Sequence, residues 1–401
     1  MRQPSSDRQV VLLNFASMAQ HGIILLLVGP LVPNLMETFS IRESMAGVLL
    51  GMGSLGFVAG PLFAGAIIDR INTRVAMLIG LAIELVVLVL FGWAPAFFVA
   101  IVANFTLHLG GSFVETAANV MPTLRQQKRP AHAVMNLVHM FFSVGAFAGP
   151  FLIGLYLEAT GEWRPIMFFT LIPTGALFLW GLTLRFPRRP AVSRESPFAH
   201  LGAVLRARYA MLGSLTLLLY VGAEVGISSW VVYYLQQQLG LSPVASASGL
   251  SILWVAIMAG RFLNSVLGNR YSSLALVAVS GVNGMVASVV FLFVESTVIA
   301  YLVLIWIGLS LSGIFPHVMA ELNNRDPEKT GTVTAVMAMG AALGAGIFQW
   351  VVGYLAETVS LTAAFVTPAV LLIVLVLTFW IAAKSPVPAA PGEASGAVPA
   401  E

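Results

Sequence analysis

The sequence contains no cysteine among its 401 residues. Disulfide bridges, thiol catalysis and sulfur-ligated metal sites are therefore excluded. The chain also lacks the Gly-Lys-Ser or Gly-Lys-Thr loop that cradles nucleotide phosphates, and the His-Glu-x-x-His pattern of zinc hydrolases. Because no motif for ATP hydrolysis is present, any energy that the chain uses must come from a gradient.

Charge is scarce as well. Asp, Glu, Lys and Arg make up 9% of the residues, and hydrophobic residues make up 58%. A soluble domain carries about 25% charged residues, so this chain has too few to cover a surface that faces water. The mean hydropathy of +0.92 and the 37 glycines and 21 prolines are typical of membrane helices. The composition therefore predicts an integral membrane protein.

Apolar runs recur along the chain, each about 20 residues long, which is the length that crosses a ~30 Å hydrocarbon core. The first run is too long for a signal peptide and no cleavage site follows it, so we expect it to be retained. We predict an all-α membrane protein with twelve transmembrane helices, near residues 10–33, 44–67, 75–94, 96–121, 131–156, 165–185, 209–235, 244–267, 273–294, 298–320, 331–355 and 361–383.

The basic residues predict an orientation. If the N-terminus is cytoplasmic, all but two of the 20 Lys and Arg residues fall in cytoplasmic segments, and Arg261 is counted among these. The two exceptions are Arg42 and Arg164. This strong positive-inside bias predicts that both termini are cytoplasmic and that the protein lies in the plasma (inner) membrane. It also explains the net charge of +3 without a nucleic-acid partner.

The longest internal connection divides the chain into two halves. We predict an N-terminal six-helix bundle over residues 1–185, a cytoplasmic linker over 186–208 and a C-terminal six-helix bundle over 209–384. The linker is rich in Pro and Arg, and it is either a solvated connection or a short helix on the membrane surface. The tail, residues 385–401, is rich in Pro, Ala and Gly, and we expect it to be disordered.

The two halves repeat each other. At a shift of 200 residues, FVAGPLFAGAIIDR at 57–70 aligns with IMAGRFLNSVLGNR at 257–270, which pairs Gly60 with Gly260. At a shift of 199, Gly145, Gly154 and Glu158 meet Gly344, Gly353 and Glu357. A nearly constant shift indicates two parallel repeats, an architecture in which transporters place the substrate site between the repeats. We therefore predict two pseudo-symmetric six-helix bundles.

Polar side chains form stripes on three of the predicted helices. They follow spacings of three and four residues, so each set lies on one helix face, and together they predict a wet cavity. The stripes are His108, Ser112, Glu115 and Asn119; Asn136, His139 and Ser143; and Tyr220, Glu224 and Ser228.

An ionisable residue inside a span is costly, so each is a candidate functional residue. A carboxyl group in the cavity can bind a proton on one side of the membrane and release it on the other. Glu115 and Glu224 are our candidates for proton coupling. The alternative for Glu115 is a structural hydrogen bond, and the alternative for Glu224 is a role in binding substrate. Glu84 has no polar stripe around it. His21 and His317 either line the cavity or are hydrogen-bonded structural residues.

The sequence resembles the major facilitator superfamily over nearly its whole length. Gly65-x-x-x-Asp69-Arg70-x-Asn72-x-Arg74 is similar to the cytoplasmic loop signature of that superfamily. The resemblance implies a gate formed by Gly65, Asp69, Arg70 and Arg74, and a cavity lined by helices one, four, seven and ten. Asn72 stands where the signature has Gly, and the second half has Asn269 in place of the Asp.

Three further segments resemble proton symporters of the fucose–galactose–glucose type: Leu219 to Glu224, Asn136 to His139 with Gly145 and Gly149-Pro150, and Gly313 to Pro316. A competing resemblance lies in Gly145-x-x-x-Gly149-Pro150-x-x-x-Gly154, which is similar to a motif of drug:proton antiporters. The alternative is that these small residues only permit close helix packing.

The prediction is thus a secondary active transporter for a small polar, sugar-like solute, coupled to protons and working by alternating access. The alternatives are an efflux antiporter and, with less support, a membrane enzyme or receptor. We expect no cofactor, metal or enzymatic activity. The expected partners are a small-molecule substrate, protons and the lipid bilayer, and we expect a monomer.

Overall fold

The computed structural model describes residues 4–121, 131–184, 186, 201–268, 270–326 and 329–386, and these form helices joined by short connections. Twelve segments of the described chain are long and apolar enough to cross a membrane, which confirms the predicted number. The helices are α1 (Pro4–Leu25), η1 (Gly29–Leu31), α2 (Val32–Phe39), α3 (Glu43–Arg70), α4 (Thr73–Gly92), α5 (Phe97–Val120), α6 (Ala131–Thr160), α7 (Arg164–Thr183), α8 (Leu201–Arg206), α9 (Arg208–Leu239), α10 (Pro243–Leu267), α11 (Ser273–Phe291), α12 (Thr297–Leu311), α13 (Ile314–Asn323), α14 (Thr330–Thr358), α15 (Leu361–Ala364) and α16 (Thr367–Lys384).

Two of the spans that bear candidate residues are broken. The first span runs from Arg8 to Phe39 and consists of α1, η1 and α2. Pro30 and Pro33 have no backbone N–H to continue a regular helix, and a short 3-10 turn accommodates the interruption. The tenth span breaks at Gly313 between α12 and α13. The sequence analysis placed the first span near residues 10–33, whereas in the structure it continues to Phe39.

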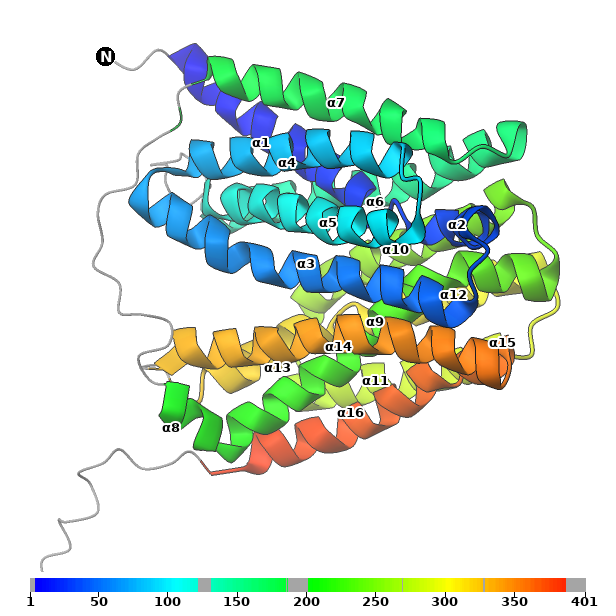
Figure 1. Cartoon of the computed structure of the whole chain (residues 1–401). Coiled ribbons are helices and arrows are strands. Elements are labelled where there is room, and N and C mark those ends of the chain that lie inside the picture. Colours follow the sequence, from blue (N-terminus) through cyan, green and yellow to red (C-terminus); the bar gives the residue numbers. More distant parts are fainter. Residues whose placement is uncertain are drawn as a thin grey trace, which may run out of the picture.

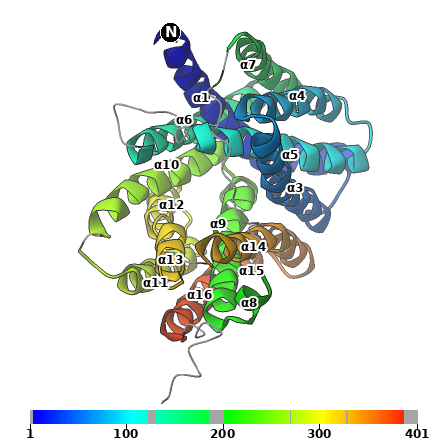
Figure 2. The same cartoon turned by 90° about the vertical axis from the view of Figure 1, so that its left-hand side faces the viewer.

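The helices form two bundles. Figure 1 shows them side by side, with the start of α1 and the end of α16 at the same end of the molecule. We call that end the terminal face and the opposite end the remote face. Figure 2, viewed at the terminal face, shows α1 to α7 grouped in one bundle and α9 to α16 in the other.

The repeat seen in the sequence is also a repeat of packing. A Cβ atom on Gly145 would lie 1.8 Å from the carbonyl oxygen of Ala19, and one on Gly344 would lie 2.0 Å from that of Leu218. Likewise, a Cβ on Gly60 would meet the Ser112 hydroxyl, and one on Gly260 would meet the Ser312 hydroxyl. Each pair of contacts is related by the shift of about 200 residues, so the two bundles are built on one plan.

The bundles meet along α3 with α14 and along α6 with α10. Gln349 Nε2 donates to Ser54 Oγ at 3.1 Å, and Ser251 Oγ donates to the carbonyl oxygen of Phe147 at 2.7 Å. The backbones of Gly51 and Gly346 approach so closely that a Cβ on Gly51 would lie 2.6 Å from the Gly346 carbonyl oxygen. All these contacts lie in the halves of the four helices next to the remote face, so the bundles are tightly joined there.

Two carboxylates join the bundles at the remote face itself. Glu158, near the end of α6, accepts the backbone N–H of Val244 in the first turn of α10 at 3.0 Å. Glu357, near the end of α14, accepts the backbone N–H of Ser44 in the first turn of α3 at 3.2 Å. A helix N-terminus has free N–H groups and a partial positive charge, so it favours a carboxylate. Each bundle thus caps a helix of the other; we call this pair the reciprocal caps.

Candidate substrate and proton site

His21 and Glu115 come together in the N-terminal bundle. The Nε2 atom of His21, on α1, lies 3.7 Å from a carboxylate oxygen of Glu115 on α5, which is longer than an ordinary hydrogen bond. The His21 side chain is 1% exposed and that of Glu115 is 26% exposed. His139 on α6 is close enough to interact electrostatically with both. We call His21, Glu115 and His139 the N-terminal cluster.

The other candidate residues of the N-terminal bundle, His108, Asn119 and Asn136, are not part of the N-terminal cluster. His108 is buried and its Nδ1 pairs with the Asn104 carbonyl oxygen of its own helix at 2.9 Å. It faces α3, where a Cβ on Gly53 would lie 3.1 Å from Nδ1. Asn119 lies one turn from Glu115 and hydrogen-bonds to it. The side chain of Asn136 lies outside the described part of the chain.

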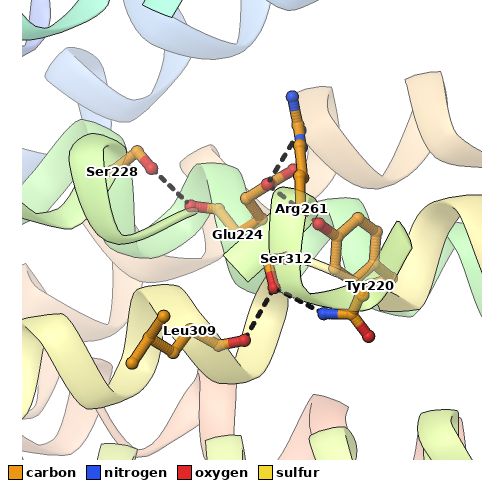
Figure 3. Close-up of polar contacts among 7 residues, drawn as sticks. Tyr220, Glu224, Ser228, Arg261, Leu309 and Ser312 are labelled. Atoms are coloured by element: carbon orange, nitrogen blue, oxygen red, sulfur yellow. Dashed lines mark hydrogen bonds and ion pairs between the residues drawn. The ribbon is translucent and has the colours of Figure 1, made fainter. Parts of the chain in front are cut away.

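A second cluster lies in the C-terminal bundle. The Tyr220 hydroxyl donates to Glu224 Oε1 at 2.9 Å, both on α9. The guanidinium of Arg261, on α10, lies 3.9 Å from the same oxygen. Figure 3 shows the Tyr220 ring, the Glu224 carboxylate and the Arg261 side chain converging on one point. We call these three residues the C-terminal cluster.

The position of Arg261 corrects the sequence analysis, which counted it as a cytoplasmic charge. It lies within the membrane-spanning helix α10 (Pro243–Leu267) and pairs with Glu224. The sequence does indicate a functional role for Arg261, because an arginine inside an apolar run is itself a candidate functional residue. That role was overlooked because Arg261 was counted among the charges that predict the orientation.

His317 lies in a separate polar group of the C-terminal bundle. Its Nε2 pairs with Asn264 Oδ1 at 3.3 Å. Asn264 in turn donates to the Ser312 hydroxyl at 3.1 Å and to the Gly260 carbonyl oxygen at 2.9 Å. Figure 3 shows Ser312 at the break of the tenth span, near the C-terminal cluster. These bonds join α10 to α12 and α13, and the sequence analysis did not single out Asn264 or Ser312.

The two clusters face each other. Electrostatic interaction links His139 of the N-terminal cluster with Arg261 of the C-terminal cluster. The side chain of Arg261, six residues before the end of α10, is 44% exposed, and that of Glu115, five residues before the end of α5, is 26% exposed. On a helix that crosses a membrane, contact of such charged groups with water or with a partner charge is favoured over contact with lipid. The arrangement supplies hydrogen-bond donors, acceptors and titratable carboxyls for one small polar solute.

The residues of the loop signature lie at the terminal face. The Asn72 side chain accepts the N–H of Val75 at 2.9 Å and so caps α4, which gives a reason for Asn at this position. Arg74 donates to the carbonyl oxygens of Gly181 and Leu182 at the end of α7. A Cβ on Gly65 would meet nothing within 4 Å. Asp69 and Arg70 end α3, and Asn269 lies outside the described residues.

The glycines of the antiporter-like motif lie in helix contacts. Gly145 packs on Ala19, and a Cβ on Gly149 would lie 3.2 Å from the Cα atom of Ile23, both on α1. A Cβ on Gly154 would lie 2.9 Å from the Pro243 carbonyl oxygen on α10. All three positions therefore serve close approach of helices, as small residues commonly do in membranes.

No group of three or more His, Cys, Asp or Glu residues within the described ranges could hold a metal ion.

Comparison with known proteins identifies the class. The model of the Major Facilitator Superfamily matches residues 10–349. The chain belongs to the major facilitator superfamily, and it is an integral membrane transporter, not an enzyme. It is 25% identical over 366 residues to a glucose/galactose transporter of Brucella abortus, covering 86% of this chain and 87% of that protein.

Two solved structures share the fold. A bacterial homologue of the lysosomal transporter Spinster, in an inward-facing and occupied conformation, superposes with a TM-score of 0.80 at 15% identity, covering 96% of this chain and 98% of that one. The transporter FucP in its outward conformation gives a TM-score of 0.63 at 19% identity, covering 94% and 99%. FucP of E. coli is a fucose:proton symporter.

Proposed function

We propose that the protein is a proton-coupled hexose transporter of the plasma (inner) membrane. The observation that carries the proposal is the pairing of a partly exposed carboxylate, Glu115, with the imidazole of His21 in the aqueous space between bundles. Such a carboxyl can accept a proton from water and hold it beside the substrate. The glucose/galactose transporter relative and the fucose:proton symporter neighbour support a hexose as the solute.

Alternating access is the second part of the proposal. The contacts between bundles lie near the remote face, while Glu115 and Arg261 remain accessible. This arrangement fits a state open at the terminal face. The superposition is closer on an inward-facing structure than on an outward one, with TM-scores of 0.80 and 0.63, which agrees with a cytoplasmic terminal face. The reciprocal caps then close the outer gate.

The proposal is tested with purified protein in proteoliposomes. We expect uptake of labelled galactose or glucose when the outside is made acidic, and collapse of that uptake when a protonophore dissipates the gradient. Exchange of labelled for unlabelled sugar should need no gradient. If the protein shows neither uptake nor exchange with galactose and neither with glucose, hexose is rejected as the substrate. Exchange without pH-driven accumulation would reject proton coupling.

The orientation is tested by labelling single cysteines, which is simple because the chain has none. We expect Gly202→Cys, on α8 at the terminal face, to react with a membrane-impermeant maleimide only after cells are permeabilised. Glu162→Cys, in the exposed connection between α6 and α7, should react in intact cells. Both positions are exposed and a side chain at 202 meets nothing nearby. The reverse pattern would place the termini outside.

A further inference from the structure

Glu84 is a buried carboxyl that the site described above does not use. It lies beyond the middle of α4 (Thr73–Gly92) and is 1% exposed. Neither of its carboxyl oxygens has a hydrogen-bond partner among the described residues. An unpaired carboxyl in a membrane helix costs free energy and forms no bond that would stabilise the bundle. A purely structural role therefore does not account for it.

Glycines place Glu84 against the helix that carries Glu115. A Cβ on Gly80 would lie 2.6 Å from the Gly110 carbonyl oxygen, and one on Gly110 would lie 3.1 Å from Glu84 Cγ. These contacts require glycine at both positions, because any side chain would push α4 and α5 apart. The close approach brings the Glu84 carboxyl to the side of α5 at which His21 lies.

His21 faces the same point as Glu84. A Cβ on Gly111 would lie 3.0 Å from His21 Nδ1 and 3.5 Å from Glu84 Oε1. The two polar atoms thus lie beside the same residue, Gly111. The other nitrogen of the same ring, Nε2, is the one that lies 3.7 Å from Glu115. Neither ring nitrogen of His21 has another hydrogen-bond partner in the described chain. The imidazole therefore stands between a carboxyl in the cavity and a carboxyl behind it.

The elements around α4 carry other charged and titratable side chains besides His21. Arg164 on α7 binds the Gly92 and Ala94 carbonyl oxygens at the remote end. Along α3 the titratable groups lie at the two ends of the helix. The described charged and titratable side chains on the elements around α4 are Glu43, Asp69 and Arg70 on α3, His108 and Glu115 on α5, Arg164 on α7, and Arg8 and His21 on α1. Of these, His21 alone is placed beside the Glu84 carboxyl through Gly111.

We propose that Glu84 is a second proton site of the transport cycle, connected to Glu115 through the imidazole of His21. In the transfer, the Glu115 carboxyl gives its proton to Nε2, and Nδ1 gives its proton to the Glu84 carboxylate, either directly or through a water molecule. The imidazole is left neutral in its other tautomer, Glu115 becomes a carboxylate and Glu84 becomes an acid. The reverse transfer returns the proton. The coupling proton is thereby held behind the cavity wall, away from substrate.

This inference rests on the proposed proton coupling, but its first test does not depend on substrate. Infrared spectra of the purified protein contain a carbonyl stretch for each protonated carboxyl, and the stretch shifts when the proton exchanges for deuterium. We expect a band that Glu84→Gln removes. In the wild type the band should shift promptly in D2O. In His21→Asn the shift should be at least about tenfold slower, a barrier increase of about 1.4 kcal/mol.

A glycine variant tests the route in a second way. Gly111→Ala adds a methyl group between Nδ1 and Oε1 and should slow the same exchange. Gly175→Ala, on α7, is the matched control, because its Cβ would make only an ordinary contact of 3.7 Å with Leu85. A wild-type spectrum without the Glu84 band would overturn the proposal. So would an exchange rate that His21→Asn leaves unchanged.

Transport supplies the second readout. Glu84→Gln, which conserves shape, should lose pH-driven accumulation and keep sugar exchange. If the wild type accumulates sugar and Glu84→Gln does so equally, Glu84 is not a proton site and the proposed function stands. If the wild type itself does not respond to pH, the proposed function fails, while the infrared measurement still decides whether His21 connects Glu84 to water.

Discussion

Glu115→Gln is expected to abolish pH-driven accumulation of sugar while exchange of sugar across the membrane continues. Glutamine keeps the size and the hydrogen-bonding capacity of the side chain but cannot titrate. One proton per sugar supports up to about tenfold accumulation per pH unit, and the variant should fall to no accumulation. The measurement is uptake into proteoliposomes with an imposed pH gradient, beside counterflow of labelled sugar without one.

Glu224→Gln is the comparison for this experiment. Glu224 is held by Tyr220 and Arg261, so a role in binding substrate predicts that its loss weakens exchange and accumulation together. Equal loss of both activities and lower stability in Glu115→Gln would indicate a structural role for Glu115. Undiminished accumulation would transfer the coupling role to Glu224.

Removal of both reciprocal caps is expected to open the outer gate. Glu158→Ala with Glu357→Ala removes both carboxylates from the helix N-termini that they cap, so the equilibrium should shift from the inward-open toward the outward-open state. Spin labels on Glu162→Cys and Glu295→Cys, in exposed connections at the remote face of the two bundles, would report the opening. We expect a new population at longer distance.

Glu37→Ala is the control for the caps. Glu37 is also an exposed acid at the remote face, near the end of α2, and it forms no ion pair in the described structure. It should leave the distance distribution unchanged. A double cap variant with the wild-type distribution would show that the other contacts of α3 with α14 and of α6 with α10 hold the outer gate closed without the caps.

The sequence predicted the fold because the membrane imposes it. Spans of about 20 apolar residues follow from bilayer thickness, and the repeat followed from a constant shift between Gly145 and Gly344. The polar stripes likewise led to Glu115 and Glu224, since spacing along a helix determines which residues share a face. The placement of Glu115 beside His21 is consistent with the predicted cavity.

Contacts between different helices could not be predicted from residue spacing along a single helix. Arg261 meets Glu224 only because α10 packs beside α9, and no spacing within either helix indicates that pairing. Glu84 had no polar neighbours on its own helix, so its relation to His21 depends on the approach of α4 to α5 at Gly80 and Gly110. The break in the first span was not predicted, because an apolar run read by composition alone does not show that the helix is interrupted near Pro30 and Pro33 and then continues as α2.

The reciprocal caps have the geometry of an isologous interface, in which one patch meets its own copy as in a two-fold dimer. In a true two-fold dimer, a substitution at such an interface appears in both identical subunits. In a single chain the two halves have separate sequences, so the two caps can differ, and here they do. Arg42, at the N-cap of α3, lies 3.4 Å from Glu357, whereas the corresponding position before α10 is Ser242, which caps its own helix through the Ala245 N–H. The closure at the remote face thus consists of one carboxylate cap that also meets a cation and one that has no such cation, so salt should weaken the first more than the second.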